Sequence, residues 1–166
     1  MSIEKNISIK CSTETIIKYW KDYFFKKHTK DIIVNFVLII IALLIYFYSE
    51  FIVLAAIIIS ICAIYLLFTF YFYYYAVISN IKRRKKYYDN LFILLNEENI
   101  QLIGDLTESK VKWNFYSQVF NGKSYYLLFD EFGKFIPIPK EELLIEEDLL
   151  WFENKLKNSG IKEKQL

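Results

Sequence analysis

Two apolar stretches decide the fold: IIVNFVLIIIALLIYFY at residues 32–48 and FIVLAAIIISICAIYLLFTFYFYYYAVI at residues 51–78. Neither stretch contains a charged residue, and only Ser49 and Glu50 separate them. A bilayer core about 30 Å thick is crossed by about 20 apolar residues of helix. A helix of a soluble protein usually keeps a polar face, and these stretches have none. The pattern therefore predicts a transmembrane hairpin over residues 31–78, with spans at about 32–48 and 51–73.

Basic residues flank the predicted hairpin on both sides. Lysines precede the first span at positions 18, 21, 26, 27 and 30, and the second span is followed by Lys82, Arg83, Arg84, Lys85 and Lys86. Basic residues favour the cytoplasmic side of a membrane, so we expect both termini to be cytoplasmic. The run at 82–86 is expected to fix this topology, and the same charges can attract anionic lipid headgroups.

Small residues in the second span suggest how its helix packs. They recur at helical spacing, which lets two helix backbones approach closely: Ala56, Ser60 and Ala63. Because the connection is so short, we expect this stripe to pack against the first span near Ala42. A homodimer interface is the alternative.

Two polar residues near the start of the first span have modest expected roles. Asn35 is expected to make a hydrogen bond close to Asp31 rather than to mark a transport path. His28, the only histidine, is expected to be an ordinary polar group at the membrane surface.

Composition limits the class of protein and its partners. Hydrophobic residues make up 55% of the 166 residues and the mean hydropathy is +0.22, which excludes intrinsic disorder. A net charge of +2 gives no reason to expect a nucleic-acid partner. Cys11 lies in a polar stretch and Cys62 within the second span, so we expect two free thiols in a reducing compartment.

The rest of the chain divides into four segments. Residues 1–30 are expected to form a short strand, with Ile7 and Ile9 alternating, and then an amphipathic helix capped by Ser12 or Thr13. Residues 79–88 are a basic linker, residues 89–158 a cytoplasmic domain, and residues 159–166 a flexible tail.

The cytoplasmic domain shows the pattern of a small antiparallel sheet closed by a helix. Expected strands lie in YYDNLFILL, IQLIG, KVKWNF, SYYLLF and FIPIP, with turns at 96–99, 104–109, 121–122 and 130–134. The two prolines make FIPIP an edge or terminal strand. Residues 140–158 are expected to be helical, with an apolar stripe of Leu144, Leu149, Phe152 and Leu156. The N-terminal strand, including Ile3, is a candidate to complete the sheet.

This order of segments resembles the YcxB-like membrane proteins of bacteria. The resemblance rests on a strand that bears a tryptophan, Trp113, and on Ile138, Pro139 and Lys140 before an acidic helix. It implies a PH-like cytoplasmic domain and the bacterial cell membrane, but no reaction. With this domain the fold class is an α+β membrane protein, in which a two-helix transmembrane hairpin accompanies a small antiparallel sheet capped by a C-terminal helix. Trp113 is expected to be a core residue and Lys140 a surface charge at a helix start.

No motif for a catalytic site, a cofactor or a metal appears, and the acidic run from Glu141 to Asp148 is explained by a helix N-terminus. We therefore expect no enzymatic activity. The first hypothesis is a membrane-anchored module that binds a cytoplasmic protein or a lipid headgroup. The alternative is an immunity protein that protects its producer from a membrane-active or secreted toxin, an analogy of architecture only.

Overall fold

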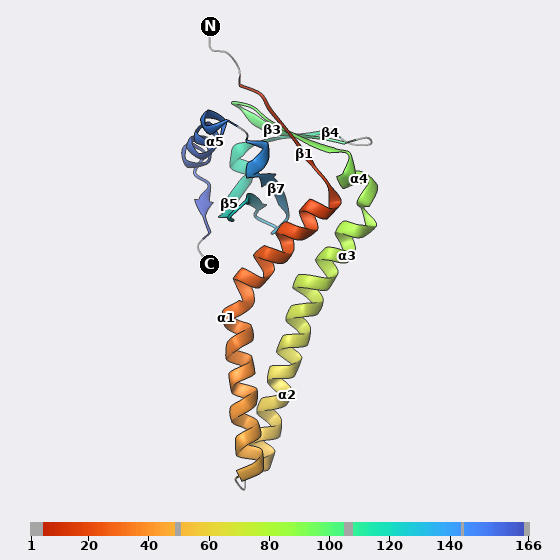
Figure 1. Cartoon of the computed structure of the whole chain (residues 1–166), viewed down its shortest axis with the longest axis vertical. Coiled ribbons are helices and arrows are strands. Elements are labelled where there is room, and N and C mark those ends of the chain that lie inside the picture. Colours follow the sequence, from red (N-terminus) through yellow and green to blue (C-terminus); the bar gives the residue numbers. More distant parts are fainter. Residues whose placement is uncertain (1–4, 49–50, 105–107, 144, 165–166) are drawn as a thin grey trace. The chain divides into compact units, whose positions relative to one another are not determined.

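The computed structural model describes residues 5–48, 51–104, 108–143 and 145–164 (Figure 1). The chain forms two compact units. The sheet unit comprises Met1–Tyr19 and Ile81–Leu166, and the hairpin unit comprises Trp20–Asn80. Ile3, the Ser49–Glu50 connection, Leu144 and part of the expected turn at 104–109 lie outside the described residues.

Two long helices build the hairpin unit (Figure 1). Helix α1 spans Thr13–Tyr48, so the expected amphipathic helix and the first span are one continuous helix. Helix α2 spans Ile52–Thr69 and continues through a π-helix, η1 (Phe70–Tyr75), into α3 (Ala76–Arg83). Among the described residues, two helices are long and apolar enough to cross a membrane. In their most apolar stretches only 6% and 17% of the residues are buried inside the protein.

The described residues of the sheet unit form two four-stranded sheets, where the sequence predicted one small sheet. In the first sheet the strands follow chain order and are all antiparallel: β1 (Ile7–Cys11), β2 (Leu91–Leu95), β3 (Asn99–Ile103) and β4 (Glu108–Lys112). Strands β1 and β2 alternate buried and exposed residues, and Ile9 pairs with Ile93. The N-terminal strand does complete a sheet with the C-terminal part of the chain.

The second sheet has the order β7-β6-β5-β8, from β5 (Tyr116–Asn121), β6 (Tyr125–Asp130), β7 (Phe135–Pro139) and β8 (Lys162–Glu163). Strand β6, which lies between β5 and β7, is buried along its whole length. Strand β7, with both prolines, is an edge strand as predicted. Gly122 fits the β5–β6 turn because a Cβ there would come within 2.7 Å of the Tyr125 ring.

Short helices complete the sheet unit: α4 (Lys85–Asp89), the 3-10 turns η2 (Trp113–Phe115) and η3 (Lys140–Glu142), and α5 (Glu146–Asn158). Phe152 and Leu156 form the buried face of α5. Gly160, with a φ of +72°, follows the helix and lets the Ile161 N–H reach back to the carbonyl of Leu156.

Several predicted boundaries are wrong. Residues 113–115 form a 3-10 turn, so Trp113 does not lie on a strand. The last helix begins at Glu146 instead of at residue 140, and residues 85–89 of the expected linker and strand are helical. The expected flexible tail contains β8, which pairs in parallel with β5. Alternation cannot reveal a strand of two residues.

Candidate functional site

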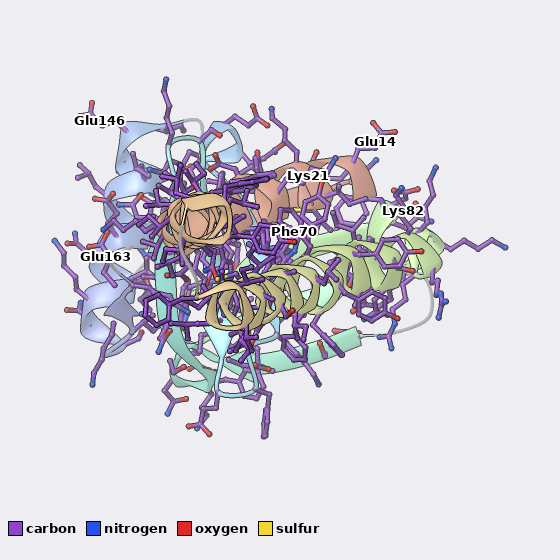
Figure 2. The ribbon with its side chains drawn as sticks, turned by 90° about the horizontal axis from the view of Figure 1, so that it is seen from below. Glu14, Lys21, Phe70, Lys82, Glu146 and Glu163 are labelled. Carbon is purple, nitrogen blue, oxygen red and sulfur yellow. The ribbon has the colours of Figure 1, made fainter. Side chains whose placement is uncertain are left out.

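The basic run that follows α2 is exposed along its length. Lys82 and Arg83 end α3, and Lys85 and Lys86 begin α4, so four of the five predicted cations lie on two short helices and Arg84 lies between them. Lys82 projects outward in Figure 2. Burial of Tyr88 raises the pKa of its hydroxyl, an effect that Arg84 opposes. The run thus presents its charge to the surroundings rather than to the core.

Asp89, at the end of α4, holds the first residue of α1. Its Oδ1 accepts the backbone N–H of Thr13 at 3.0 Å, and the Thr13 hydroxyl donates to the Lys85 carbonyl at 3.4 Å. The hydrogen bonds from Thr13 lower the pKa of the Asp89 carboxyl. Ser12 caps the same helix by accepting the Thr15 N–H at 3.2 Å. The sequence predicted a cap at Ser12 or Thr13, of which the structure shows Ser12, but it did not predict the distant partner Asp89.

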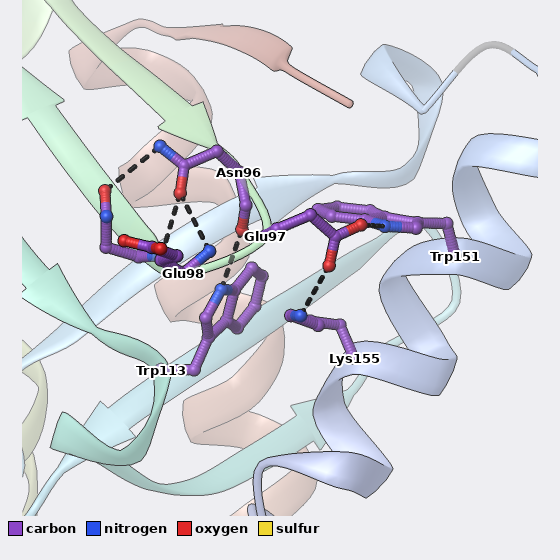
Figure 3. A network of polar contacts seen from close by, with 7 residues as sticks. Asn96, Glu97, Glu98, Trp113, Trp151 and Lys155 are labelled. Carbon is purple, nitrogen blue, oxygen red and sulfur yellow. Dashed lines mark hydrogen bonds and ion pairs between the residues drawn. The ribbon is translucent and has the colours of Figure 1, made fainter. Parts of the chain in front are cut away.

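Trp113 lies in a polar network at the β2–β3 turn (Figure 3). The Trp113 side chain is only 3% exposed, and its Nε1 donates to the Asn96 carbonyl at 2.9 Å. Asn96 Oδ1 in turn accepts the N–H groups of Glu98 and Asn99 at 3.1 and 2.8 Å, which fixes the turn. Trp113 is therefore a core residue, as predicted.

The same turn is tied to helix α5 through Glu97 (Figure 3). The Glu97 carboxylate accepts Trp151 Nε1 at 2.7 Å and pairs with Lys155 Nζ at 2.6 Å. Lys155 and Trp151 together lower the pKa of Glu97. The predicted turn at 96–99 was the only sign in the sequence of this network, because its partners lie more than fifty positions away.

Lys140 is half-buried, and its side chain contacts polar and aromatic neighbours. Its Nζ donates to Asn121 Oδ1 at 2.7 Å and lies 4.5 Å from the centre of the Tyr126 ring. Partial burial lowers the pKa of Lys140, while Glu153 and Glu163 oppose this shift. The Tyr126 hydroxyl donates to Glu153 Oε1 at 2.6 Å.

One residue of the suggested family motif, Trp113, contacts Phe152 of α5 together with Tyr126. Phe152 is fully buried, and its ring centre lies 6.0 Å from that of Trp113 and 5.1 Å from that of Tyr126. Ile138 is fully buried and Pro139 is buried beside Lys140. The contacts of Trp113 are those of a structural core. Phe152 belongs to the apolar stripe predicted for the last helix, whereas the sequence did not indicate that Tyr126 contacts it.

The predicted packing stripe of α2 is wrong. Ala56 and Ser60 are exposed and Ala63 is half-buried. The inward face instead carries Ala55, Cys62 and Thr69, small residues that are buried and recur every seven positions. Both stripes have helical spacing, and only the rotation of the helix in the packed pair distinguishes them. Burial of Ala42 in α1 agrees with the prediction, and the homodimer stays a prediction.

Aromatic side chains surround the start of the hairpin unit. Trp20 Nε1 donates to the Tyr73 carbonyl at 2.9 Å, within the π-helix. His28 is 8% exposed, with its ring 4.9 Å from Phe24 and 5.5 Å from Tyr73, so the expectation of an ordinary surface group is wrong. Burial lowers the pKa of His28; Lys27 acts in the same direction and Asp31 opposes it. Asn35 Nδ2 donates to the Asp31 carbonyl at 2.8 Å, as predicted.

Both cysteines of the chain are free, as predicted, and both are buried. Burial raises the pKa of Cys11 to about 12, and its thiol donates to the Pro137 carbonyl at 3.6 Å. Within the described residues, no group of three His, Cys, Asp or Glu side chains is placed to hold a metal ion.

Comparisons of the chain with protein-family models, with curated proteins and with solved structures find no match. The resemblance to the YcxB-like proteins therefore stays a proposal.

Proposed function

We propose that this chain is a multi-pass protein of the bacterial cell membrane, whose helices hold the sheet unit at the cytoplasmic face as a binding module without catalysis. The outward faces of α1 and α2 support insertion. Apolar side chains are exposed on both helices, such as Val37 at 48% and Val53 at 74% exposure. In water such an apolar surface would favour aggregation, whereas in a bilayer lipid chains would cover it.

One observation carries the topology: β1 pairs with β2 although the whole hairpin lies between them in the chain. Their register joins Ile7 to Leu95 and Cys11 to Leu91. Paired strands must occupy the same compartment. If the helices between them cross a membrane, they must therefore cross it an even number of times. The exposed cations at 82–86 favour the cytoplasmic side for the sheet unit.

The proposed type of module is a PH-like domain of the YcxB-like class. Support comes from the order of the elements, since four antiparallel strands are followed by a second antiparallel set and by helix α5. The contacts of Trp113 and Tyr126 with Phe152 also support a helix that closes the sheets.

Reporter fusions in bacterial cells test the topology. Alkaline phosphatase is active outside the cytoplasm, and green fluorescent protein fluoresces inside it. We expect a phosphatase inserted between Tyr48 and Phe51 to be active, and fluorescent protein at either terminus to fluoresce. Extraction of the chain by alkaline carbonate without detergent, or an active phosphatase at the C-terminus, would contradict the proposal.

Crosslinking in intact cells tests the binding role. A photo-crosslinking residue at exposed positions of the sheet unit should capture one reproducible cytoplasmic protein or lipid. Protection of cells against a toxin on expression of the chain, with no crosslinked partner, would favour the immunity alternative.

A further inference from the structure

We propose that the exposed cations of residues 82–86 bind the headgroups of anionic phospholipids in the membrane into which the hairpin inserts. This inference rests on the proposed membrane insertion and names a partner of that membrane anchor. The partner is a lipid surface of negative charge, distinct from any ligand that the two β-sheets bind.

Three charges of this segment have no acidic partner among the described residues. Lys82, Arg83 and Lys86 form no ion pair with any residue that the structure describes. The nearest acidic residue in the chain, Asp89, accepts the Thr13 N–H and interacts with Lys85. Five consecutive cations repel one another, so a surface of opposite charge lowers their free energy.

The position of the segment matches the depth of the headgroups. If the lipid core ends between Tyr73 and Ile78, Lys82 follows it by about 6 to 14 Å of helix at 1.5 Å per residue. The headgroup region extends about 5 to 7 Å from the core, and a Debye length adds about 8 Å at physiological salt. Phosphate groups therefore lie within reach of Lys82 and Arg83.

The segment also buries its apolar residues and exposes its basic residues. Ile78 and Ile81 of α3 are buried, whereas Lys82 and Arg83 are exposed. The helix is interrupted at Arg84, which has φ −99° and ψ +25°, and restarts at Lys85. Basic residues adjacent to a span attract anionic lipid in an additive manner, so the loss of three charges should be measurable.

The test uses the full chain in lipid nanodiscs that contain phosphatidylcholine and phosphatidylglycerol. Spin-labelled versions of both lipids report, by electron paramagnetic resonance, the fraction of each held at the protein. The test variant is K82Q/R83Q/K86Q. The matched control, K110Q/K112Q/K123Q, removes three exposed lysines of the sheet unit that also lack ion pairs among the described residues.

We expect the parent chain and the control to prefer phosphatidylglycerol and the preference to weaken with added salt. The preference of the test variant for phosphatidylglycerol should be at least about fivefold weaker than that of the parent chain. A fivefold change corresponds to the contribution of one basic residue near a charged surface. An unchanged preference in a variant that incorporates and folds normally would overturn this inference and point to another partner, such as an acidic protein, while leaving membrane insertion intact. Failure of the parent chain to incorporate into nanodiscs would contradict the proposed function itself.

Discussion

The backbone N–H of Thr13 donates a hydrogen bond of 3.0 Å to the side chain of Asp89, a residue 76 positions later. Thr13 begins α1 and Asp89 ends α4, so this bond joins the two chain segments that lead into and out of the hairpin. Next to it, Cys11 pairs with Leu91 at the end of the β1–β2 ladder. Two chain segments of the sheet unit, one before and one after the hairpin in the sequence, are thus joined by hydrogen bonds.

The charge of Asp89 should contribute stability that depends on pH. The hydrogen bonds from Thr13 lower its pKa below the ordinary 3.8, so the contribution is complete above that value and is lost as the pH falls through the lowered pKa. We expect Asp89→Asn to lower the melting temperature at pH 6 and to have no effect at strongly acidic pH. Circular dichroism in mild detergent measures this.

The control for this prediction is Glu131→Gln, which removes an exposed carboxylate that is not hydrogen-bonded to any described residue. A decrease for Asp89→Asn that is the same at every pH would contradict the electrostatic explanation.

The pairing of β1 with β2 should be essential for the sheet unit. Ile9 is fully buried opposite Ile93, so Ile9→Ala should lower the free energy of unfolding by about 2 to 4 kcal/mol. Ser8→Ala, on the exposed face of the same strand, should change it by less than about 0.5 kcal/mol. Amide hydrogen exchange of β2 measures the effect locally, and equal exchange in the two variants would show that β1 adds little.

The Trp113 indole should act through both its hydrogen bond and its ring. Trp113→Phe keeps an aromatic ring against Phe152 but removes the donor to Asn96, and we expect a loss of about 1 to 2 kcal/mol. Trp113→Ala should cost about 3 to 5 kcal/mol because it also leaves a cavity. Denaturant unfolding followed by circular dichroism gives both values. Similar losses for the two variants would assign the whole effect to the hydrogen bond.

The rotation of α2 is tested by two adjacent alanines. Ala55 is fully buried and Ala56 is exposed, so Ala55→Leu should destabilise the hairpin unit by about 1 to 3 kcal/mol through overpacking. Ala56→Leu should have little effect on the same melting curve in detergent. The reverse order would restore the stripe predicted from the sequence.

Much of the hairpin could be read from residues 32–48 and 51–78, because a long apolar run leaves few alternatives to a helix. The turns at 121–122 and 130–134 and the edge position of β7 were also predicted, since proline and turn residues act locally. Trp113 was correctly expected to be buried. The strand predicted around it was wrong, because alternation over a few residues also occurs in a 3-10 turn followed by a strand.

The sequence by itself determined that this chain has two long apolar helices, basic flanks and a terminal α+β part, because these features depend on composition and short-range periodicity. Only the tertiary structure decided that β1 and β2 pair across the hairpin, that Ala55 rather than Ala56 faces inward, and that Trp113 and Tyr126 meet at Phe152. Each of these depends on contacts between distant residues, and local preferences cannot choose among the partners that are chemically able to make them.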